Sequence, residues 1–354
     1  MNCRTFASAN EAYHAVYEDV LNDGARFSHR EGRSCLELRP YVFTLADPHI
    51  GLYTGVTRRM NYRFWAAETL GYIAGWGSIY RAKEYADLLV RLNSNYANFR
   101  DPYTEALHKM VCYGDSFGPG LLRAYETLKA GPNRRQAIVY IGSPETRHTY
   151  EDNPCLATAH YYMEHRAAPV KVAPTWDTED ISPIEDMQAV RRGDYVVKPV
   201  LSALYHIRSN DLNWGFPYDV AAFCAIQLAL ASALGVAPGA YHHMATSMHF
   251  YESGPMGEGP PNIAPYEEEV WAALPPAMPA ADHQCSMHGA QALAGILLDA
   301  MHGHFVVNNG RGAGFQLPKW EDNEWARQWC DVVRWGWPSK KSMHESPVGG
   351  PAYY

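Results

Sequence analysis

The chain has 354 residues, of which 47% are hydrophobic and 13% aromatic, and its formal net charge is -8 at pH 7. This length allows one large domain or two ordinary ones, and the apolar content suffices for an extensive core. The acidic balance argues against a surface that coats nucleic acid, although a local basic pocket could still hold a single phosphate. No apolar stretch has the length expected of a membrane span, so we expect no membrane association.

Seven cysteines occur singly, without the paired spacing of zinc sites or disulfide frameworks. They are Cys3, Cys35, Cys112, Cys155, Cys224, Cys285 and Cys330. The first residues also lack the basic-then-apolar pattern of a secretory signal. These features predict a reducing, cytoplasmic location and no bound metal.

The first quarter of the chain reads as helix, loop and strand. Apolar periodicity predicts a helix over 9–22 that ends before Gly24, followed by a loop at 26–34. Alternating residues then predict a strand at 35–45, and a Gly-punctuated helical pattern covers 60–76.

In the middle of the chain, 120–133 reads as a helix that closes in a turn, and 135–142 and 156–165 read as strands. Residues 170–192 mix prolines with acidic residues without clean periodicity. We interpret them as a surface insertion.

A strand is predicted at 199–209, and then a helix at 220–234 that stops at Gly235. This helix is apolar on nearly all faces, so we expect it to be central and buried. After a Gly/Pro-rich stretch, further helices are predicted at 284–301 and 323–335. No internal repeat and no low-complexity segment is evident.

Cys155 stands in "NPC" between a charged turn and a predicted strand, where a nucleophilic thiol could be fixed. A buried structural cysteine is the commoner interpretation of such a residue. The pattern becomes specific when distant motifs are combined in chain order. These are "HREG" (29–32), a helix containing Glu68, "YG" (113–114), "NRRQAIV" (133–139), "NPC" (153–155), "RSNDLNWGFPYDVAAF" (208–223) and "HFY" (249–251).

This series resembles the thymidylate synthase family over roughly 11–254. The resemblance implies an α/β (α+β) layered fold with a mixed sheet and a central buried helix, used as an obligate homodimer. It implies a catalytic domain at 1–254 that includes the insertion, and a divergent C-terminal helical extension at 255–354.

The resemblance assigns the nucleotide phosphate to four arginines and a serine. Arg30, Arg208 and Ser209 would bind it within one subunit, and Arg134 and Arg135 would reach it from the partner. Guanidinium groups bind phosphate bidentately and stay charged. The alternative for each arginine is a surface ion pair, and one of the adjacent pair could be structural because their side chains diverge.

By the same resemblance, Cys155 attacks carbon 6 of a pyrimidine and Glu68 is the general acid/base. A thiol is mostly protonated near neutral pH, so nearby arginines would have to favour the thiolate. Tyr113 is expected beside the nucleophile. The alternatives are an exposed helix glutamate for Glu68 and core packing for Tyr113.

Sugar and folate contacts are implied for six residues. His249 and Tyr251, alternate residues of one strand, would contact the sugar 3'-hydroxyl, although a core histidine is a real alternative for His249. The folate pocket would be lined by Asp211, Trp214, Gly215 and Tyr218. Asp211 would bind the pterin ring, and the aromatic residues could equally belong to the core.

Asp219 stands where a thymidylate synthase carries asparagine. A carboxylate accepts from the amino group of cytosine and can share a proton with the ring nitrogen, but it cannot donate to the 4-oxygen of uracil unless protonated. Within the family, this exchange marks deoxycytidylate hydroxymethylases and related cytidylate-modifying enzymes. The alternative is an N-cap of the following helix, a role worth about 1 kcal/mol.

Further departures from the family pattern point away from thymidylate synthesis. Leu156 replaces a histidine, Ile207 a glutamine and Ser247 an aspartate, and Phe99 occupies the place of a folate-flanking tryptophan. The final hundred residues do not match the synthase tail.

The sequence therefore predicts a cytosine nucleotide (CMP or dCMP) 5-hydroxymethyltransferase that uses 5,10-methylenetetrahydrofolate as co-substrate. One alternative is a methyltransferase that produces 5-methylcytidylate or thymidylate, in which folate also donates a hydride. The other is a catalytically silent nucleotide-binding relative, against which Cys155 and Glu68 argue. The choice between ribose and deoxyribose stays open.

Overall fold

The computed structural model describes residues 3–28, 34–53, 60–76, 79–93, 99–142, 153–169, 190–192, 195–252 and 287–308. Arg30, the greater part of the predicted insertion and the helix predicted at 323–335 lie outside these ranges.

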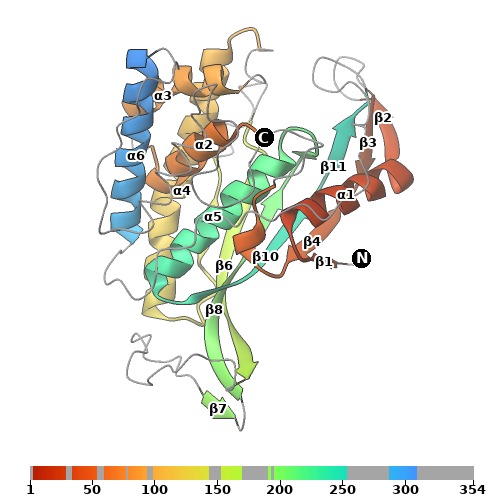
Figure 1. The fold of residues 1–354 in the computed structure, drawn as a ribbon, viewed down its shortest axis with the longest axis vertical. Coiled ribbons are helices and arrows are strands. Elements are labelled where there is room, and N and C mark those ends of the chain that lie inside the picture. Colours follow the sequence, from red (N-terminus) through yellow and green to blue (C-terminus); the bar gives the residue numbers. More distant parts are fainter. Residues whose placement is uncertain are drawn as a thin grey trace, which may run out of the picture.

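A seven-stranded sheet runs through the middle of the protein (Figure 1). Its strand order is β1 (Arg4–Phe6), β4 (Tyr41–Leu45), β10 (Ala237–Ala245), β8 (Tyr195–Ile207), β6 (Leu156–Pro169) and β5 (Ile138–Tyr140), with β7 (Val190–Arg192) paired to β8. β10 is parallel to β8 and antiparallel to β4, while β6 is antiparallel to β8. The predicted mixed sheet is confirmed.

A second sheet of four strands positions the candidate site. Its order is β2 (Ala25–Ser28), β3 (Ser34–Leu38), β11 (Met248–Tyr251) and β9 (Asn210–Asp211). β9 follows β8 almost directly, and β11 follows β10 in the same way. Two neighbouring strands of the large sheet therefore pass together into the small one.

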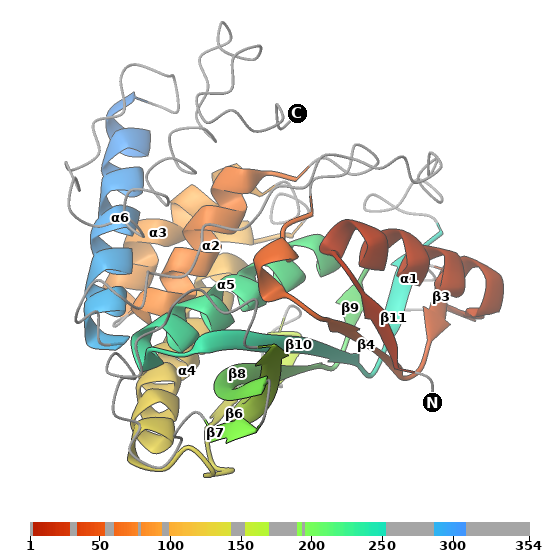
Figure 2. The same ribbon diagram turned by 60° about the horizontal axis from the view of Figure 1, so that its bottom comes forward.

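The described residues form six helices, of which three pack directly on the sheets and three pack mainly on other helices. They are α1 (Ala9–Asp23), α2 (Tyr62–Ala74), α3 (Ile79–Leu92), α4 (Pro102–Ala130), α5 (Phe216–Leu234) and α6 (Met287–Asn308), and a short 3-10 helix spans Pro48–Ile50. α2, α3, α4 and α6 gather at one end of the protein and α1 lies at the other (Figures 1 and 2). α5 runs between them along one face of the seven-stranded sheet.

The predicted central helix is confirmed in α5, because most of its residues are buried and it contacts α1, α2, α4, α6, β8 and β10. By length and composition α5 could span a membrane, but 78% of its apolar window is buried inside the protein. A helix that is hydrophobic all round is expected in the core of a protein of this size.

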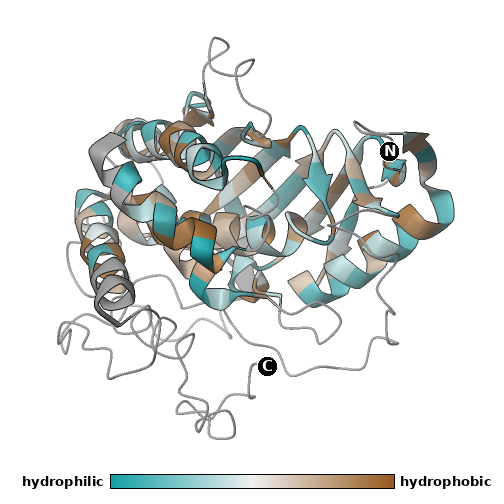
Figure 3. Cartoon of the chain, turned by 90° about the horizontal axis from the view of Figure 1, so that it is seen from above, coloured by the Kyte–Doolittle hydropathy of each residue, from teal (hydrophilic) through white to brown (hydrophobic). Residues whose placement is uncertain are grey.

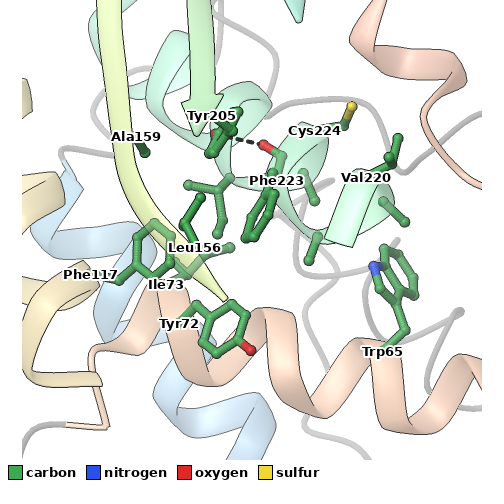
Figure 4. Packing of buried hydrophobic residues seen from close by; sticks show 14 of the residues in the cluster. Trp65, Tyr72, Ile73, Phe117, Leu156, Ala159, Tyr205, Val220, Phe223 and Cys224 are labelled. Carbon is green, nitrogen blue, oxygen red and sulfur yellow. Dashed lines mark hydrogen bonds between the residues drawn. The ribbon is translucent and has the colours of Figure 1, made fainter. Parts of the chain in front are cut away.

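Aromatic packing joins α5 to the sheet and to α4 (Figure 4). Tyr205 of β8 stacks on Phe223 of α5 with ring centroids 4.7 Å apart, and its hydroxyl donates to the Phe223 carbonyl at 2.8 Å. Phe117 of α4 lies 6.3 Å from Phe223. Each such buried aromatic side chain stabilises the fold by roughly 1.5 to 3 kcal/mol.

The other face of the seven-stranded sheet is more polar, and Figure 3 shows hydrophilic residues interspersed with hydrophobic ones along the strands. Along β10, Tyr241 and His243 are buried, whereas the intervening His242 is half-buried. His242 forms a hydrogen bond with Thr44 at 2.8 Å and stacks on Tyr162. In the described residues no helix covers this face.

Several predicted boundaries were wrong. Residues 26–28, expected in a loop, belong to β2, and the single strand expected at 35–45 is two strands that belong to different sheets. α4 begins at Pro102, although the helix was expected from residue 120. Proline usually interrupts a helix, but here the chain stays helical through Pro119. The end of the predicted insertion forms β7, and α3 was not predicted.

Candidate active site

Three segments that are distant in sequence meet where the large sheet passes into the small one. The Arg208 backbone N–H donates to the Cys155 carbonyl at 2.8 Å, and Asn210 N–H donates to Ser247 O at 2.8 Å. Leu212 N–H donates to His249 O at 2.8 Å. These bonds hold the Pro-Cys turn, the Arg-Ser segment and the His-Phe-Tyr strand side by side, so the structure brings three of the predicted motifs together.

Cys155 is half-buried in the turn before β6. Its Sγ lies 3.9 Å from the Asn153 carbonyl oxygen. The next residue, Leu156, donates its backbone N–H to the Tyr113 hydroxyl at 3.4 Å. Cys155 is therefore partly exposed. The backbone that follows it is held by the hydrogen bond to Tyr113 of α4.

Arg208 holds the other side of this turn. Its NH2 group donates to Asn153 O at 2.8 Å and its Nε to Pro154 O at 3.2 Å, while the side chain remains exposed. A guanidinium has five N–H donors, so further donors remain for an anion. Ser209 follows in a half-buried position.

Asp219 lies in the first turn of α5 and is not its N-cap. The helix starts at Phe216, four residues earlier than predicted, and Gly215 occupies the cap position without a side-chain hydrogen bond. Pro217 suits this start because its fixed φ fits a first helical turn. The Asp219 carboxylate instead accepts a hydrogen bond from Asn210 Nδ2 at 2.6 Å.

The pKa of Asp219 is raised to about 7, mainly because the carboxyl is buried and in part because of the charge of Glu68. Lys109 and the hydrogen bond from Asn210 act in the opposite direction on the same pKa. Glu68 of α2 and Lys109 of α4 therefore lie close enough to Asp219 for their charges to act on it. Near neutral pH this carboxyl exchanges its proton readily.

Tyr113 of α4 interacts electrostatically with both the Cys155 thiol and Asp219. It is buried, with 3% of its surface exposed, and burial together with the charges of Asp219 and Cys155 raises its pKa well above the ordinary value. Cys155, Tyr113, Asp219 and Glu68 thus form one electrostatically coupled group.

The predicted folate segment forms a tight turn around Asp211. Its Oδ1 accepts from the backbone N–H groups of Asn213 at 2.7 Å and Trp214 at 3.0 Å, and Gly215 N–H donates to Asp211 O at 2.9 Å. Asp211 and Trp214 are half-buried. A carboxylate beside an aromatic ring suits a flat heterocycle with N–H donors, so these residues fit a pterin.

Tyr218 connects α5 to α2. Its hydroxyl accepts from Asn61 N–H at 2.7 Å, and its ring meets Phe64 edge-on with centroids 5.3 Å apart. A packing role for Tyr218 is therefore shown, while its contact with folate stays a prediction.

His249 and Tyr251 lie on β11 at the edge of the site. His249 is 5% exposed, its Nδ1 is 3.1 Å from Ser247 Oγ, and its ring meets Tyr251 edge-on at 5.3 Å. In the sheet register His249 pairs with Asp211, so the proposed sugar and folate contacts are neighbours. The low exposure of His249 shows a packing role, while its contact with a sugar stays a prediction.

Arg134 and Arg135 are not part of this cluster. Both are exposed in the turn between α4 and β5, and neither pairs with an acidic side chain among the described residues. Exposed arginines of this kind can serve another subunit, but nothing in one chain tests that role.

Asn210 and Lys109 were missed as functional candidates. Asn210 lies inside the Arg-Ser segment, next to Asp211. Adjacent residues of a strand point to opposite faces, so Asn210 could have been expected to point away from the side that Asp211 faces. Lys109 precedes Tyr113 by four residues on α4, the spacing that places both on one side of a helix.

The departures at Leu156 and Ile207 are fully buried, apolar core positions with 1% and 0% exposure. Phe99 is partly buried against the same core. Across the described ranges, no group of three or more His, Cys, Asp or Glu side chains is placed to hold a metal ion.

The chain is similar to known proteins over most of its length. The model of a family described as thymidylate synthase matches residues 11–256. A deoxyuridylate hydroxymethyltransferase of Bacillus phage SP01 is 24% identical over 250 residues, which is 68% of this chain and 56% of that protein. A bifunctional dihydrofolate reductase-thymidylate synthase of Leishmania amazonensis is 26% identical over 128 residues, or 36% of this chain and 19% of that protein. The chain thus spans little more than half the length of the phage relative and a fifth of the other.

Proposed function

Because the chain belongs to the thymidylate synthase family, we propose that it transfers a hydroxymethyl group to carbon 5 of a cytosine nucleotide. The observation that carries the proposal is the Asp219 carboxyl, which lies in the same coupled group as Cys155, Tyr113 and Glu68. At this position a carboxyl can read the base.

In this proposal the Cys155 thiolate adds to carbon 6 of the pyrimidine, and carbon 5 becomes nucleophilic. Methylenetetrahydrofolate supplies the one-carbon unit that carbon 5 takes up. Glu68 moves the carbon 5 proton, tetrahydrofolate leaves the one-carbon unit as an exocyclic methylene, and water oriented by Glu68 adds to that methylene to form the hydroxymethyl group. Release of Cys155 then restores the aromatic ring.

Binding is divided among the remaining residues. Arg208, Ser209 and Arg30 would hold the phosphate, and His249 and Tyr251 the sugar. The folate would lie against the turn formed by Asp211, Trp214 and Gly215, with Tyr218 behind it. Arg208 would couple the two tasks, because the same guanidinium holds the carbonyls before Cys155.

Base recognition follows from the protonation of Asp219. Cytosine offers an amino donor at position 4 and an acceptor at nitrogen 3, so a carboxyl that carries one proton matches both. The pKa of about 7 supports this, because the shared proton is available at neutral pH. The same pKa allows a second candidate, hydroxymethylation of deoxyuridylate, which the name of the phage relative also favours.

We further propose a homodimer that forms through the polar face of the seven-stranded sheet, with Arg134 and Arg135 reaching the partner's phosphate site. Half-buried polar side chains such as His242 and Tyr162 support a face that is covered by a second copy. Mixing Cys155→Ala with Arg135→Ala protein should restore about a quarter of wild-type turnover, since half of the dimers would then contain one intact site. No recovery after proven subunit exchange would show that each site is built from one chain.

The deciding experiment incubates the protein with methylenetetrahydrofolate and each of CMP, dCMP, UMP and dUMP, followed by mass analysis of the nucleotide. A gain of one hydroxymethyl group on CMP or dCMP, without dihydrofolate formation, would support the proposal. A methylated product with dihydrofolate would indicate a methyltransferase. Reaction of uracil nucleotides alone would refute the cytosine assignment, and no reaction with any of them would favour a silent relative.

A further inference from the structure

Asn210 and Asp219 form an unusually constrained pair. Asn210 is 1% exposed in β9, and its backbone N–H is held by Ser247 O at 2.8 Å. Its Nδ2 lies 2.6 Å from Oδ2 of Asp219. A Cβ atom at Gly215 would come within 3.0 Å of Asn210 Nδ2 and 3.1 Å of Asp219 Oδ2, so a glycine there leaves room for the contact.

A carboxyl group that carries one proton does not by itself distinguish the two bases. With its acceptor oxygen toward position 4 and its proton toward nitrogen 3, it matches cytosine. With the two oxygens exchanged, it donates to the 4-oxygen and accepts from N3–H, which matches uracil. Specificity therefore requires something that makes the two oxygens different.

We infer that Asn210 sets the base preference by keeping Oδ2 of Asp219 as an acceptor and confining any proton on that carboxyl to Oδ1. The inference rests on the proposed function, in which Asp219 reads the base. A hydrogen bond from an amide N–H stabilises the negative charge on the oxygen that accepts it. That oxygen is therefore a less favourable site of protonation than the other oxygen of the same carboxyl. Oδ2 then faces the amino group of cytosine, and Oδ1 shares the proton with ring nitrogen 3.

The Asn210 side chain orients the Asp219 carboxyl. Among the described residues, Asn210 makes no other side-chain hydrogen bond. Its Oδ1 is buried without a partner within that part of the chain. Leaving a buried oxygen without a hydrogen bond typically destabilises a protein by about 1 to 3 kcal/mol. The Asn210 amide therefore does not have this position because it satisfies all of its own hydrogen-bonding groups. Its one described polar partner is the Asp219 carboxylate.

The titratable groups that face Asp219 come from four elements and differ in sign. They are Glu68 on α2, Lys109 and Tyr113 on α4, Asp211 on β9 and Tyr241 on β10. Their charges change the protonation of Asp219 as a whole. Among the described residues, Asn210 is the one whose side chain forms a hydrogen bond with an Asp219 oxygen, and it contacts Oδ2. This contact makes the two oxygens different.

The test compares Asn210→Ala and Asn210→Leu with the wild type, measuring kcat/KM on cytosine and uracil nucleotides from pH 5.5 to 9. Neither replacement can donate a hydrogen bond to Oδ2 of Asp219. We expect the cytosine-to-uracil ratio to fall about tenfold in both variants, mainly through a gain on uracil. That gain should disappear as pH rises, because only the protonated carboxyl can donate to the 4-oxygen. Asn210→Leu keeps the branched shape of the side chain, so it covers the case in which Asn210→Ala leaves a cavity and does not fold.

Gln227→Leu is the matched control. Gln227 is a fully buried amide on α5 that donates to Leu201 O, Gly239 O and Ala240 O, away from Asp219. Its replacement should lower the melting temperature and leave both the ratio and its pH dependence unchanged.

Asp219→Asn separates the inference from the proposed function. If Asp219→Asn shifts preference toward uracil while both Asn210 variants keep the wild-type ratio and pH profile, the role of Asn210 is refuted and the base assignment stands. If Asp219→Asn leaves the preference unchanged, the base-reading function itself fails. A change in the Asn210 variants that Gln227→Leu reproduces would also overturn the inference, because it would report general damage.

Discussion

The two ends of the candidate site differ in exposure and in how they use charge. At the base end, Asp219 lies half-buried against the fully buried Asn210, and burial raises its pKa to about 7. At the phosphate end, the Arg208 side chain is exposed while it holds two backbone carbonyls.

This difference separates affinity from selectivity. An exposed guanidinium attracts any phosphate and carries no information about the base. A half-buried carboxyl whose two oxygens are held in different roles, one accepting and one carrying the proton, favours the base whose donors and acceptors match that arrangement. We therefore expect mutations at the phosphate end to affect all nucleotides alike, and mutations at the base end to change their order.

The largest effect should come from the thiol between the two ends. Cys155→Ala should reduce turnover by at least about 10⁴-fold and stop tritium release from carbon 5, since no adduct can form. Nucleotide binding by calorimetry should persist, because both ends are intact. The exposed Cys3 provides the control, and Cys3→Ala should behave as wild type. Substantial turnover by the Cys155 variant would remove it as the nucleophile.

Next in size is the phosphate end. Arg208→Ala loses charge-assisted hydrogen bonds to the phosphate and to the turn before Cys155, worth about 2 to 3 kcal/mol or roughly 30- to 100-fold in kcat/KM. The loss should be equal for cytosine and uracil nucleotides. Arg123→Ala, at an exposed position of α4, should have little effect. A change of base order in Arg208→Ala would contradict the division between the two ends.

The base end should respond in the opposite way. Asp219→Asn should lower kcat/KM on the cytosine nucleotide and raise it on the matching uracil nucleotide, because an amide can donate to the 4-oxygen. A mismatched buried polar group costs about 1 to 3 kcal/mol, so the ratio should shift roughly 10- to 100-fold. Asp219 is not the N-cap of α5, so a loss of capping is not expected. A melting curve checks folding.

The smallest effect concerns stability. The folded-state pKa of Asp219, about 7, lies above the ordinary value near 4, so the folded protein binds more protons than the unfolded chain between these pH values. Stability should therefore fall as pH rises from about 4 to 8, and Asp219→Asn should remove this loss. We expect the variant to gain about 1 to 3 kcal/mol relative to wild type between pH 5 and 8.

Urea unfolding at fixed protein concentration measures this gain, and Asp115→Asn is the control because it makes the same charge change at an exposed position of α4. Equal pH dependence in wild type and Asp219→Asn would show that the carboxyl is not strained by burial.

Much of the fold follows from local patterns in the sequence. The apolar run before Gly235 predicted the buried helix α5, and the periodicity at 9–22 predicted α1 almost to the residue. The ordered motifs that resemble the thymidylate synthase family pointed to Cys155 and to the Arg-Ser segment, and their assignment to one site was a prediction from that resemblance. The structure places these two segments in contact.

The tertiary structure decided what depends on partners distant in the chain. The strand expected at 35–45 could not be divided between two sheets from its alternation alone, because alternation does not reveal which strand will pair with it. The start of α5 depended on the turn around Asp211, and that earlier start excludes the alternative in which Asp219 is the N-cap and makes its carboxylate a partner of Asn210. Its raised pKa required burial beside Glu68, which lies 151 positions earlier in the sequence (219 minus 68). Sequence determines which groups are available, but their charge and orientation depend on the distances and burial that only the folded chain creates.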